Sequence, residues 1–353
     1  MEIRDLVRRH SRDYNFIADA RTGFTFRWGR TEDENPRVAP WPELVDISIT
    51  NRCHKGCPGC YRDSRPDGSD MTQADWELTL NSLISPAWGP VFQVAFGGGE
   101  PTLHPALPRM MADCRSQGIV PNYTTNGSHL SEEVLEATAR FAGAVAVSWH
   151  GGGGQSETLN AVRQFKEAQV EKVNIHFLLS NSTFAEALAI LSDKSDWALD
   201  GVNAIVFLTA KPKGRCPSSE VLDYTAPAFA EFLALLHNPQ CQTNLGIDPC
   251  LAPALIQHTD ADLRDLDTCE GAFFSLFIDE QLNVKPCSFA DDSFTYSLRS
   301  YSLDTIWGQL LEPYRQQTEA LTQNYCTHCR GIGDCRGVCR FYPELYQCQI
   351  STP

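Results

Sequence analysis

Short apolar runs alternate with amphipathic stretches through the first 212 residues of the chain. Runs rich in β-branched and aromatic residues predict six strands, at 45–50, 91–96, 119–125, 144–149, 173–179 and 203–208. Apolar positions at helical spacing predict five helices between them, at 71–84, 107–118, 131–141, 156–168 and 184–194. Several of these helices begin after Ser or Thr, which cap helix N-termini, and one ends at Gly118.

Strands that alternate with helices predict βα units and a parallel sheet with right-handed crossovers. We therefore expect an α/β fold, with a partial (β/α)6 TIM-like barrel over 44–212. Residues 1–43 form an N-terminal extension, with a hairpin expected in 16–29 that turns at a Thr-Gly pair. After the barrel we expect a linker or helical bridge at 213–248 and a second, cysteine-rich domain at 249–353.

Residues suited to chemistry follow the predicted strands. Cys53, Cys57 and Cys60 come after the first strand, and a Gly-Gly-Glu-Pro sequence (98–101) comes after the second. Asn126 follows the third strand, while Ser148 lies near the end of the fourth, just before His150 and four glycines. Parallel α/β sheets bind ligands at the carboxyl ends of their strands, so these motifs predict a site at that edge.

Length and charge narrow the class of protein. A chain of 353 residues with 42% hydrophobic residues can form a large domain and a smaller one. A formal net charge of −15 argues against nucleic acid or an anionic membrane as the main partner. The N-terminus lacks the apolar core of a signal peptide, and no apolar run approaches the length of a membrane span, so a cytoplasmic protein is expected.

The 14 cysteines favour metal or redox chemistry, because a reducing compartment disfavours disulfides. Three lie at 53–60 and eight lie between 250 and 348. The other three, Cys114, Cys216 and Cys241, stand alone and are interpreted as packing residues.

The first cysteine group has the spacing C-x3-C-x2-C. One loop with this spacing can hold three irons of a [4Fe–4S] cube and leave the fourth iron open to a ligand. An incomplete zinc knuckle and three incidental buried thiols are the alternatives. In the next motif, Gly98 and Gly99 allow close backbone approach, and the Glu100 carboxylate can hold an ammonium group.

These two motifs together resemble those of the radical S-adenosylmethionine (SAM) superfamily. The resemblance implies a SAM-binding [4Fe–4S] cluster on Cys53, Cys57 and Cys60. It also implies SAM contacts from Gly98, Gly99, Glu100, Pro101, Asn126 and Ser148. One position departs from the family pattern: Gly59 stands where an aromatic residue usually precedes the third cysteine, and Tyr61 follows that cysteine instead.

The last cysteines, in 326–348, have the spacing C-x2-C-x5-C-x3-C followed by one more cysteine. Alone, the first four also fit a zinc ribbon. The whole string resembles the SPASM extension of radical SAM proteins, which implies two auxiliary [4Fe–4S] clusters and three clusters in all. The resemblance assigns Cys250, Cys269, Cys287 and Cys339 to auxiliary cluster I, and Cys326, Cys329, Cys335 and Cys348 to auxiliary cluster II. A glycine usual in the hairpin before Cys287 is replaced by Leu282.

The resemblance implies an enzyme that reductively cleaves SAM to a 5′-deoxyadenosyl radical. Its expected reaction is an oxidative modification, such as a crosslink or a thioether, of a side chain in a ribosomally made peptide. A precursor peptide and an electron donor such as flavodoxin or ferredoxin are the implied partners. Only 43 residues precede the first predicted barrel strand, fewer than a winged-helix leader-binding domain needs, so another mode of leader capture is expected.

Three other functions stay open at this point. One is a radical SAM dehydrogenase of a small molecule, and another is an electron-transfer protein with several clusters. The third is an anaerobic sulfatase-type maturase, which is disfavoured because Ser288, not Asp, follows Cys287. Asp279, Asp291 and Asp292 are the remaining carboxylates that could act as a base in such a reaction.

Overall fold

The computed structural model describes residues 6–149, 155–192, 201–237, 241, 243–262, 266–326, 329, 331, 335–336, 339–342 and 345. All six predicted strands are present and lie parallel to one another: β4 (Leu44–Thr50), β7 (Gln93–Gly98), β8 (Val120–Thr125), β9 (Ala144–Trp149), β10 (Val173–Leu179) and β11 (Ala204–Thr209). The five predicted helices follow them in order: α1 (Gln73–Ser82), α2 (Leu107–Ser116), α3 (Glu132–Phe141), α4 (Gln155–Glu167) and α5 (Phe184–Ser192). The predicted α/β fold is therefore confirmed.

Local chemistry explains where two of these helices begin. The Thr72 side chain accepts a hydrogen bond from the Asp75 backbone N–H ahead of α1, and Ser131 does the same for Val134 ahead of α3. Each bond satisfies one of the backbone N–H groups that the first helical turn leaves free. The Ser and Thr positions noted in the sequence thus act as N-caps.

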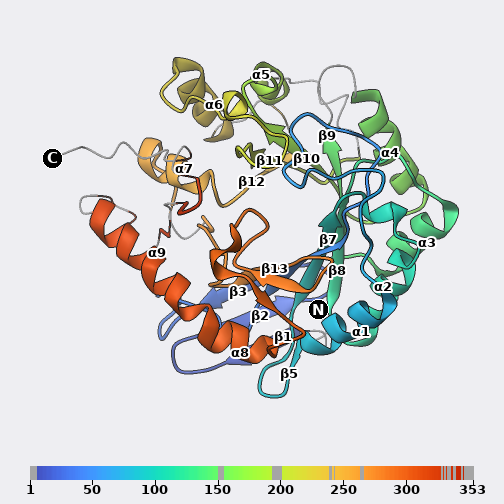
Figure 1. Cartoon of the computed structure of the whole chain (residues 1–353). Coiled ribbons are helices and arrows are strands. Elements are labelled where there is room, and N and C mark those ends of the chain that lie inside the picture. Colours follow the sequence, from blue (N-terminus) through green and yellow to red (C-terminus); the bar gives the residue numbers. More distant parts are fainter. Residues whose placement is uncertain are drawn as a thin grey trace.

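The parallel strands curve into an arc with the helices on its outside (Figure 1). Side chains that face the helices are buried, as in the T-shaped contact between Trp76 of α1 and Phe96 of β7 at 5.6 Å between ring centroids. Phe207 of β11 packs in the same way on Phe232 of α6 (Pro227–His237). The alternate strand positions face the inside of the arc, because successive side chains of a strand point to opposite faces.

The sheet continues beyond the predicted barrel on both edges. β12 (Asn244–Ile247) pairs parallel with β11, and β13 (Ser275–Ile278) pairs parallel with β4. β13 continues into an antiparallel meander through β14 (Asn283–Lys285) and β15 (Tyr296–Ser297). The sheet thus has ten strands in the order β12-β11-β10-β9-β8-β7-β4-β13-β14-β15, and the cysteine-rich region supplies one edge of it.

Leu282, in the turn between β13 and β14, explains the missing hairpin glycine. Its φ of +70° lies in the left-handed region, which glycine adopts without cost and which costs other residues roughly 1–2 kcal/mol. The Leu282 side chain is fully buried in the core, and burial of a Leu contributes roughly 1.5–3 kcal/mol. Apolar packing therefore offsets the backbone strain at this position.

The N-terminal residues form a separate antiparallel sheet of β1 (Leu6–His10), β2 (Asn15–Asp19) and β3 (Thr25–Trp28). The predicted hairpin is the β2–β3 pair. Two short strands, β5 (Ile84–Ser85) and β6 (Gly89–Pro90), pair after α1. The buried Arg9 guanidinium of β1 donates to the carbonyl oxygens of Trp41, Pro42 and Pro90, which attaches this sheet to the chain on both sides of β4.

The remaining helical elements belong to the second half of the chain and include α7 (Ala252–His258), α8 (Leu303–Thr305), the π-helical turn η7 (Ile306–Leu310) and α9 (Glu312–Tyr325). Short 3₁₀ turns are η2 (Pro101–Leu103), η4 (Ser218–Glu220) and η6 (Asp292–Phe294). Trp307 of η7 donates to the Ala39 carbonyl at 3.0 Å, and Arg315 of α9 donates to the Ala272 carbonyl at 2.5 Å. In the described part of the chain, no helix combines the length and apolar character that crossing a bilayer requires. The division into domains at 43, 212 and 248 stays a prediction.

Because β13 belongs to the same sheet as β4, we expect the barrel and the cysteine-rich region to unfold together. Leu276→Ala removes a buried β13 side chain, and we expect it to lower the free energy of unfolding by about 2–5 kcal/mol in a single transition. Leu78→Ala, at an exposed position of α1, is the matched control and should cost far less. Denaturant titration of the two variants checks this, and a second transition affected only by Leu276→Ala would contradict it.

Candidate functional site

The loop that carries the first three cysteines starts directly after β4. A register shift between Ser48 and Thr50 ends the regular pairing of β4 with β7. The loop then folds back on itself, since the Cys53 N–H donates to the Arg65 carbonyl at 2.9 Å and the Asp63 N–H donates to the Cys60 carbonyl at 3.3 Å. We call residues 53–65 the cluster loop.

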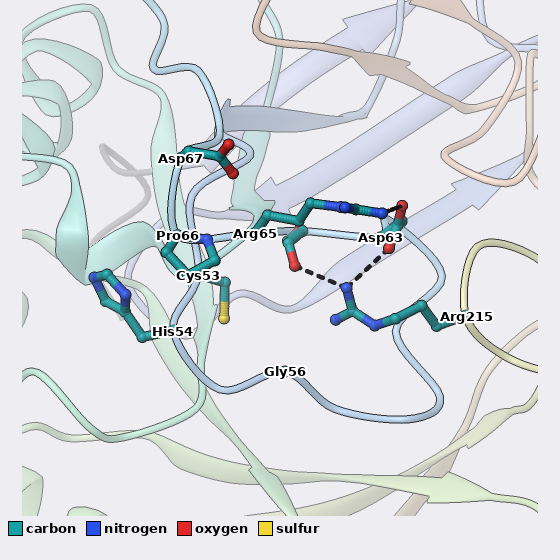
Figure 2. Close-up of a pocket in the computed structure, with 9 residues that line it drawn as sticks. Cys53, His54, Gly56, Asp63, Arg65, Pro66, Asp67 and Arg215 are labelled. Atoms are coloured by element: carbon teal, nitrogen blue, oxygen red, sulfur yellow. Dashed lines mark hydrogen bonds and ion pairs between the residues drawn. The ribbon is translucent and has the colours of Figure 1, made fainter.

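The three thiols of this loop are half-buried and lie close enough to interact electrostatically. Burial raises the pKa of Cys57, and the neighbouring Cys53 and Cys60 raise it further. Cys53 borders a cavity of about 540 Å³ whose lining also includes His54, Gly56, Asp63, Arg65 and Arg215 (Figure 2). Neighbouring thiolates repel one another, and a bound cation or metal cluster relieves this repulsion.

Arg215, which follows β11, holds the cluster loop in shape. Its backbone N–H donates to the Cys60 carbonyl at 2.9 Å, and its Nε donates to the Cys57 carbonyl at 3.1 Å. One terminal nitrogen donates to both the Asp63 carboxylate and the Ser64 carbonyl at 2.9 Å (Figure 2). Sequence analysis did not single out Arg215, because only the tertiary fold brings it to the loop.

Gly214 allows this approach. Its φ is +62°, and a Cβ at this position would lie 2.5 Å from the carbonyl oxygens of Cys60 and Tyr61. No other residue fits both the backbone angle and the space. Gly214 and Arg215 therefore pack directly against the cluster loop.

The glycines at the end of β7 and directly after it have packing roles, while their predicted close approach to a ligand stays a prediction. A Cβ on Gly98 would lie 2.2 Å from Ser48 Oγ and from the Thr50 carbonyl oxygen, and Gly98 has a φ of +108°. A Cβ on Gly99 would lie 2.2 Å from the Arg52 carbonyl oxygen. Both glycines thus let the end of β7 pack against the end of β4 and against Arg52, just before the cluster loop. Gly97 is different: no described atom lies within 4 Å of its Cβ position, so it borders open space.

Glu100 is fully buried and accepts hydrogen bonds from protein groups at both carboxylate oxygens. Oε1 accepts from the Thr102 N–H and from the hydroxyls of Thr102 and Thr125, while Oε2 accepts from the Asn126 N–H at 2.7 Å. The carboxylate therefore fixes the end of β8 onto the end of β7. Pro101 opens the 3₁₀ turn η2 beside it. Contact of Gly98, Gly99, Glu100 and Pro101 with SAM stays a prediction.

Asn126 lies against the cluster loop. Its Nδ2 is 3.7 Å from Cys53 Sγ, and its Oδ1 accepts from the Ser128 N–H. Ser148 lies on β9, paired in register with His176 of β10, and is half-buried. His150 and the glycines at 151–154 lie outside the described residues. The structure thus brings Asn126 to the first cysteine, while a role for Ser148 stays a prediction.

The unusual Gly59 and Tyr61 are explained by their neighbours. A Cβ on Gly59 would lie 3.3 Å from Leu178 Cδ2 of β10, so Leu178 occupies the space beside this position. The Tyr61 ring stacks on Phe289 with 4.5 Å between ring centroids. Tyr61 therefore joins the cluster loop to the segment after Cys287.

A second group of four thiols forms where the sequence predicts auxiliary cluster I. Cys250 interacts electrostatically with Cys269 and Cys339, and Cys287 interacts with Cys269 and Cys339. Burial is the main cause that raises their pKa values, to about 12 for Cys269 and about 11 for Cys287. The Lys211 ammonium, buried nearby, pairs with Asp248 at 3.1 Å and interacts with Cys250. Thiols whose pKa is raised in this way need a metal or a cation before they can become thiolates.

The third cysteine group is only partly described. Cys326 and Cys329 interact electrostatically, and the Cys329 N–H donates to the Cys326 carbonyl at 3.0 Å. The Cys335 N–H donates to the Gly331 carbonyl, and the Gly331 N–H lies 3.4 Å from Cys329 Sγ. Cys348 lies outside the described residues. Among the residues that the structure describes, no three His, Cys, Asp or Glu side chains lie close enough to bind one metal ion, and this holds for all three cysteine groups.

The parallel α/β fold and the three-cysteine loop are similar to those of radical SAM proteins. Residues 47–193 match the model of the Radical SAM superfamily, and the chain carries the cysteine-rich C-terminal extension expected of the SPASM subfamily. Members of this superfamily hold a [4Fe–4S] cluster and SAM.

Two curated relatives match part of the chain. PqqA peptide cyclase of Xanthomonas euvesicatoria pv. vesicatoria (strain 85-10) is 33% identical over 104 residues, which cover 28% of this chain and 26% of the relative. A tungsten-containing aldehyde ferredoxin oxidoreductase cofactor-modifying protein of Pyrococcus furiosus is 32% identical over 97 residues, which cover 27% of each. The match thus spans about a quarter of the length of these relatives.

Solved structures match almost the whole fold. Streptococcus suis SuiB bound to its precursor peptide SuiA has a TM-score of 0.73 at 13% identity, covering 99% of both chains. anSMEcpe with bound AdoMet and Cp18Cys peptide has a TM-score of 0.62 at 17% identity, covering 88% of this chain and 91% of that one. These matches confirm the predicted architecture.

Arg215 should be needed to form the first cluster. Arg215→Ala removes three hydrogen bonds to the cluster loop, so we expect fewer irons per chain after anaerobic reconstitution and a weaker electron paramagnetic resonance (EPR) signal. Arg65→Ala is the matched control, because this exposed arginine contacts the same Asp63 without holding the cysteine backbone. Equal iron retention in both variants would show that the hydrogen bonds from the Arg215 side chain are not needed to form the cluster.

Gly97 and Gly98 should respond differently when each is replaced by Ala. Gly98→Ala should lower the free energy of unfolding by about 2 kcal/mol or more, because it adds backbone strain and a steric clash. Gly97→Ala should leave stability unchanged but weaken SAM binding, since its methyl group enters open space. Denaturant titration and equilibrium dialysis with SAM separate the two effects, and a destabilised Gly97→Ala would contradict the assignment.

Proposed function

We propose that this protein is a radical SAM enzyme that oxidatively modifies a side chain of a ribosomally made peptide. The observation that carries the proposal is the pairing of two thiol groups. A three-thiol loop with open space beside it and a half-buried group of four thiols are connected by one stacked aromatic pair, Tyr61 and Phe289. The activity named for PqqA peptide cyclase and the precursor peptide bound to SuiB support a peptide substrate.

The residues around the first loop fit a cluster with one open iron and a bound SAM. Cys53, Cys57 and Cys60 would hold the cluster, and the open space in front of Gly97 would admit SAM. When bound, the reduced cluster and SAM supply a 5′-deoxyadenosyl radical that takes a hydrogen atom from the substrate. The chain itself contributes orientation: Arg215 fixes the cluster loop, and Glu100 holds Asn126 beside Cys53.

Two auxiliary clusters would complete the protein. Cys250, Cys269, Cys287 and Cys339 would hold the first, and Cys326, Cys329, Cys335 and Cys348 the second. Fully ligated clusters can accept electrons from a substrate radical, which favours a net oxidation. The external electron donor would be a flavodoxin or ferredoxin.

The sulfatase-type alternative gains no base from the three carboxylates considered for it. Asp279 accepts from the N–H groups of Gln281 and Asn283 and so fixes the hairpin turn. Asp291 caps η6, and the fully exposed Asp292 pairs with Lys285. Each carboxylate has a structural or solvent-facing role, so peptide crosslinking or thioether formation remains the better proposal.

The decisive experiment is anaerobic reconstitution followed by incubation with SAM and dithionite. We expect 5′-deoxyadenosine and methionine to form, and about twelve irons per chain if three cubes assemble. A variant with Cys53, Cys57 and Cys60 replaced by Ala should lose the nucleoside while keeping about eight irons. Iron incorporation without any 5′-deoxyadenosine would favour an electron-transfer protein instead.

A further inference from the structure

β3 is an edge strand of the N-terminal sheet, whose order is β1-β2-β3 (Figure 1), and it carries exposed aromatic side chains. Phe24, directly before β3, is 63% exposed, and Phe26 is 49% exposed. The Trp28 ring lies 5.4 Å from the Phe26 ring, measured between centroids. Arg27 points to the opposite face, where it pairs with Glu43 at 2.9 Å. Exposed aromatic side chains grouped on one face in this way are typical of an interaction surface.

The outer edge of β3 has backbone groups without a partner in the described part of the chain. The Asp19 N–H donates to the Phe24 carbonyl at 2.9 Å, so every second residue from Phe24 onward turns its backbone groups toward β2. Thr25 and Arg27 turn theirs away from β2, and neither backbone forms a hydrogen bond to another described residue. β3 contains no Pro, Lys or bulge, the features that often keep a strand edge from pairing.

A second copy of β3 fits this edge about a two-fold axis. Thr25 of one copy would pair antiparallel with Arg27 of the other, and Arg27 with Thr25, which satisfies the outward N–H and C=O groups of both strands. This register places the two copies of Phe26 directly opposite each other, in a non-hydrogen-bonded pair, where cross-strand side chains lie closest. Phe24 of each copy lies opposite Trp28 of the other. The exposed aromatic side chains of the two copies therefore form one continuous row.

The charges at the two ends of β3 are complementary in the same arrangement. Arg21 lies in the turn before β3, Glu32 and Asp33 lie in the loop after it, and all three are exposed. Within the described residues none of these three forms an ion pair, whereas Arg30 of the same loop is paired with Glu34 at 3.4 Å. Because the two strands run antiparallel, the turn of one copy meets the loop of the other. The pairing therefore brings an arginine to two carboxylates at each end of the contact.

We propose that this chain forms a homodimer in which the β3 edges of two copies pair antiparallel and join two three-stranded sheets into one six-stranded sheet. The contact is short, because β3 has only four residues. We therefore expect a reversible dimer with a dissociation constant in the micromolar range, since small interfaces are typical of weak association. The interface lies on the N-terminal sheet, so it goes beyond the proposed function and does not depend on the cysteine groups.

Sedimentation velocity of the reconstituted full chain, over a concentration series around the micromolar range, tests the dimer. We expect the unmodified chain to change from monomer to dimer as its concentration rises. Phe26→Glu should raise the dissociation constant about tenfold or more, because it places two carboxylates opposite each other at the two-fold axis. Leu78→Glu, at an exposed apolar position of α1, is the matched control and should leave the dissociation constant unchanged.

A charge exchange tests the register. Arg21→Glu should weaken the dimer, and adding Glu32→Arg and Asp33→Arg to it should restore the dimer, because the unlike charges then face each other again. A chain that stays monomeric over the whole series would overturn the proposal and leave this edge to a strand of a different protein. Equal dimerisation of Phe26→Glu and Leu78→Glu would overturn it as well. If Phe26→Glu does not fold, Thr25→Pro serves in the same measurement, since it removes an outward N–H that β2 does not use.

Discussion

The parallel ladder between β4 and β13 is the constraint on which the rest of the structure depends. β4 leads directly into the cluster loop, and the hairpin that starts with β13 leads to Cys287. The backbone hydrogen bonds between these two strands therefore fix how far apart the two thiol groups lie. Side-chain contacts such as the stack of Tyr61 on Phe289 can then be short and specific, because the strands beneath them are already in register.

The segment that follows β11 makes a second connection between the two thiol groups. After β11 the chain passes under the cluster loop, where Arg215 holds the loop backbone. Lys213 donates to the carbonyls of Ser288 and Ala290, and Lys211 lies 4.3 Å from the centre of the Phe289 ring. Residues at alternate positions of one short segment thus reach the first loop and the second thiol group. Moving this segment would disturb both groups together.

The sequence predicted the parts of the fold that have strong local signals. The six strands and five helices carry clear apolar periodicity, and the cysteine spacings identify the loop that β4 leads into. β12 was missed because a four-residue strand has too little pattern. The hairpin expected before Cys287 is the β13–β14 pair, but the pairing of β13 with β4 was missed because it is set by the tertiary fold. Arg215 was missed for the same reason, since its contacts join residues more than 150 positions apart. The sequence could not show why Leu282 is tolerated in the hairpin turn either, because its backbone strain is offset by side-chain burial that only the fold provides.

In the Gly-Gly-Glu-Pro motif the structure shows packing roles in addition to the ligand contacts that the sequence predicts. Gly98 and Gly99 remove side chains that would strike the end of β4 and Arg52, and Glu100 spends its hydrogen-bonding capacity on Thr102, Thr125 and Asn126. These residues build the edge of the site. The surface left open is at Gly97, where no described atom lies within 4 Å of the Cβ position.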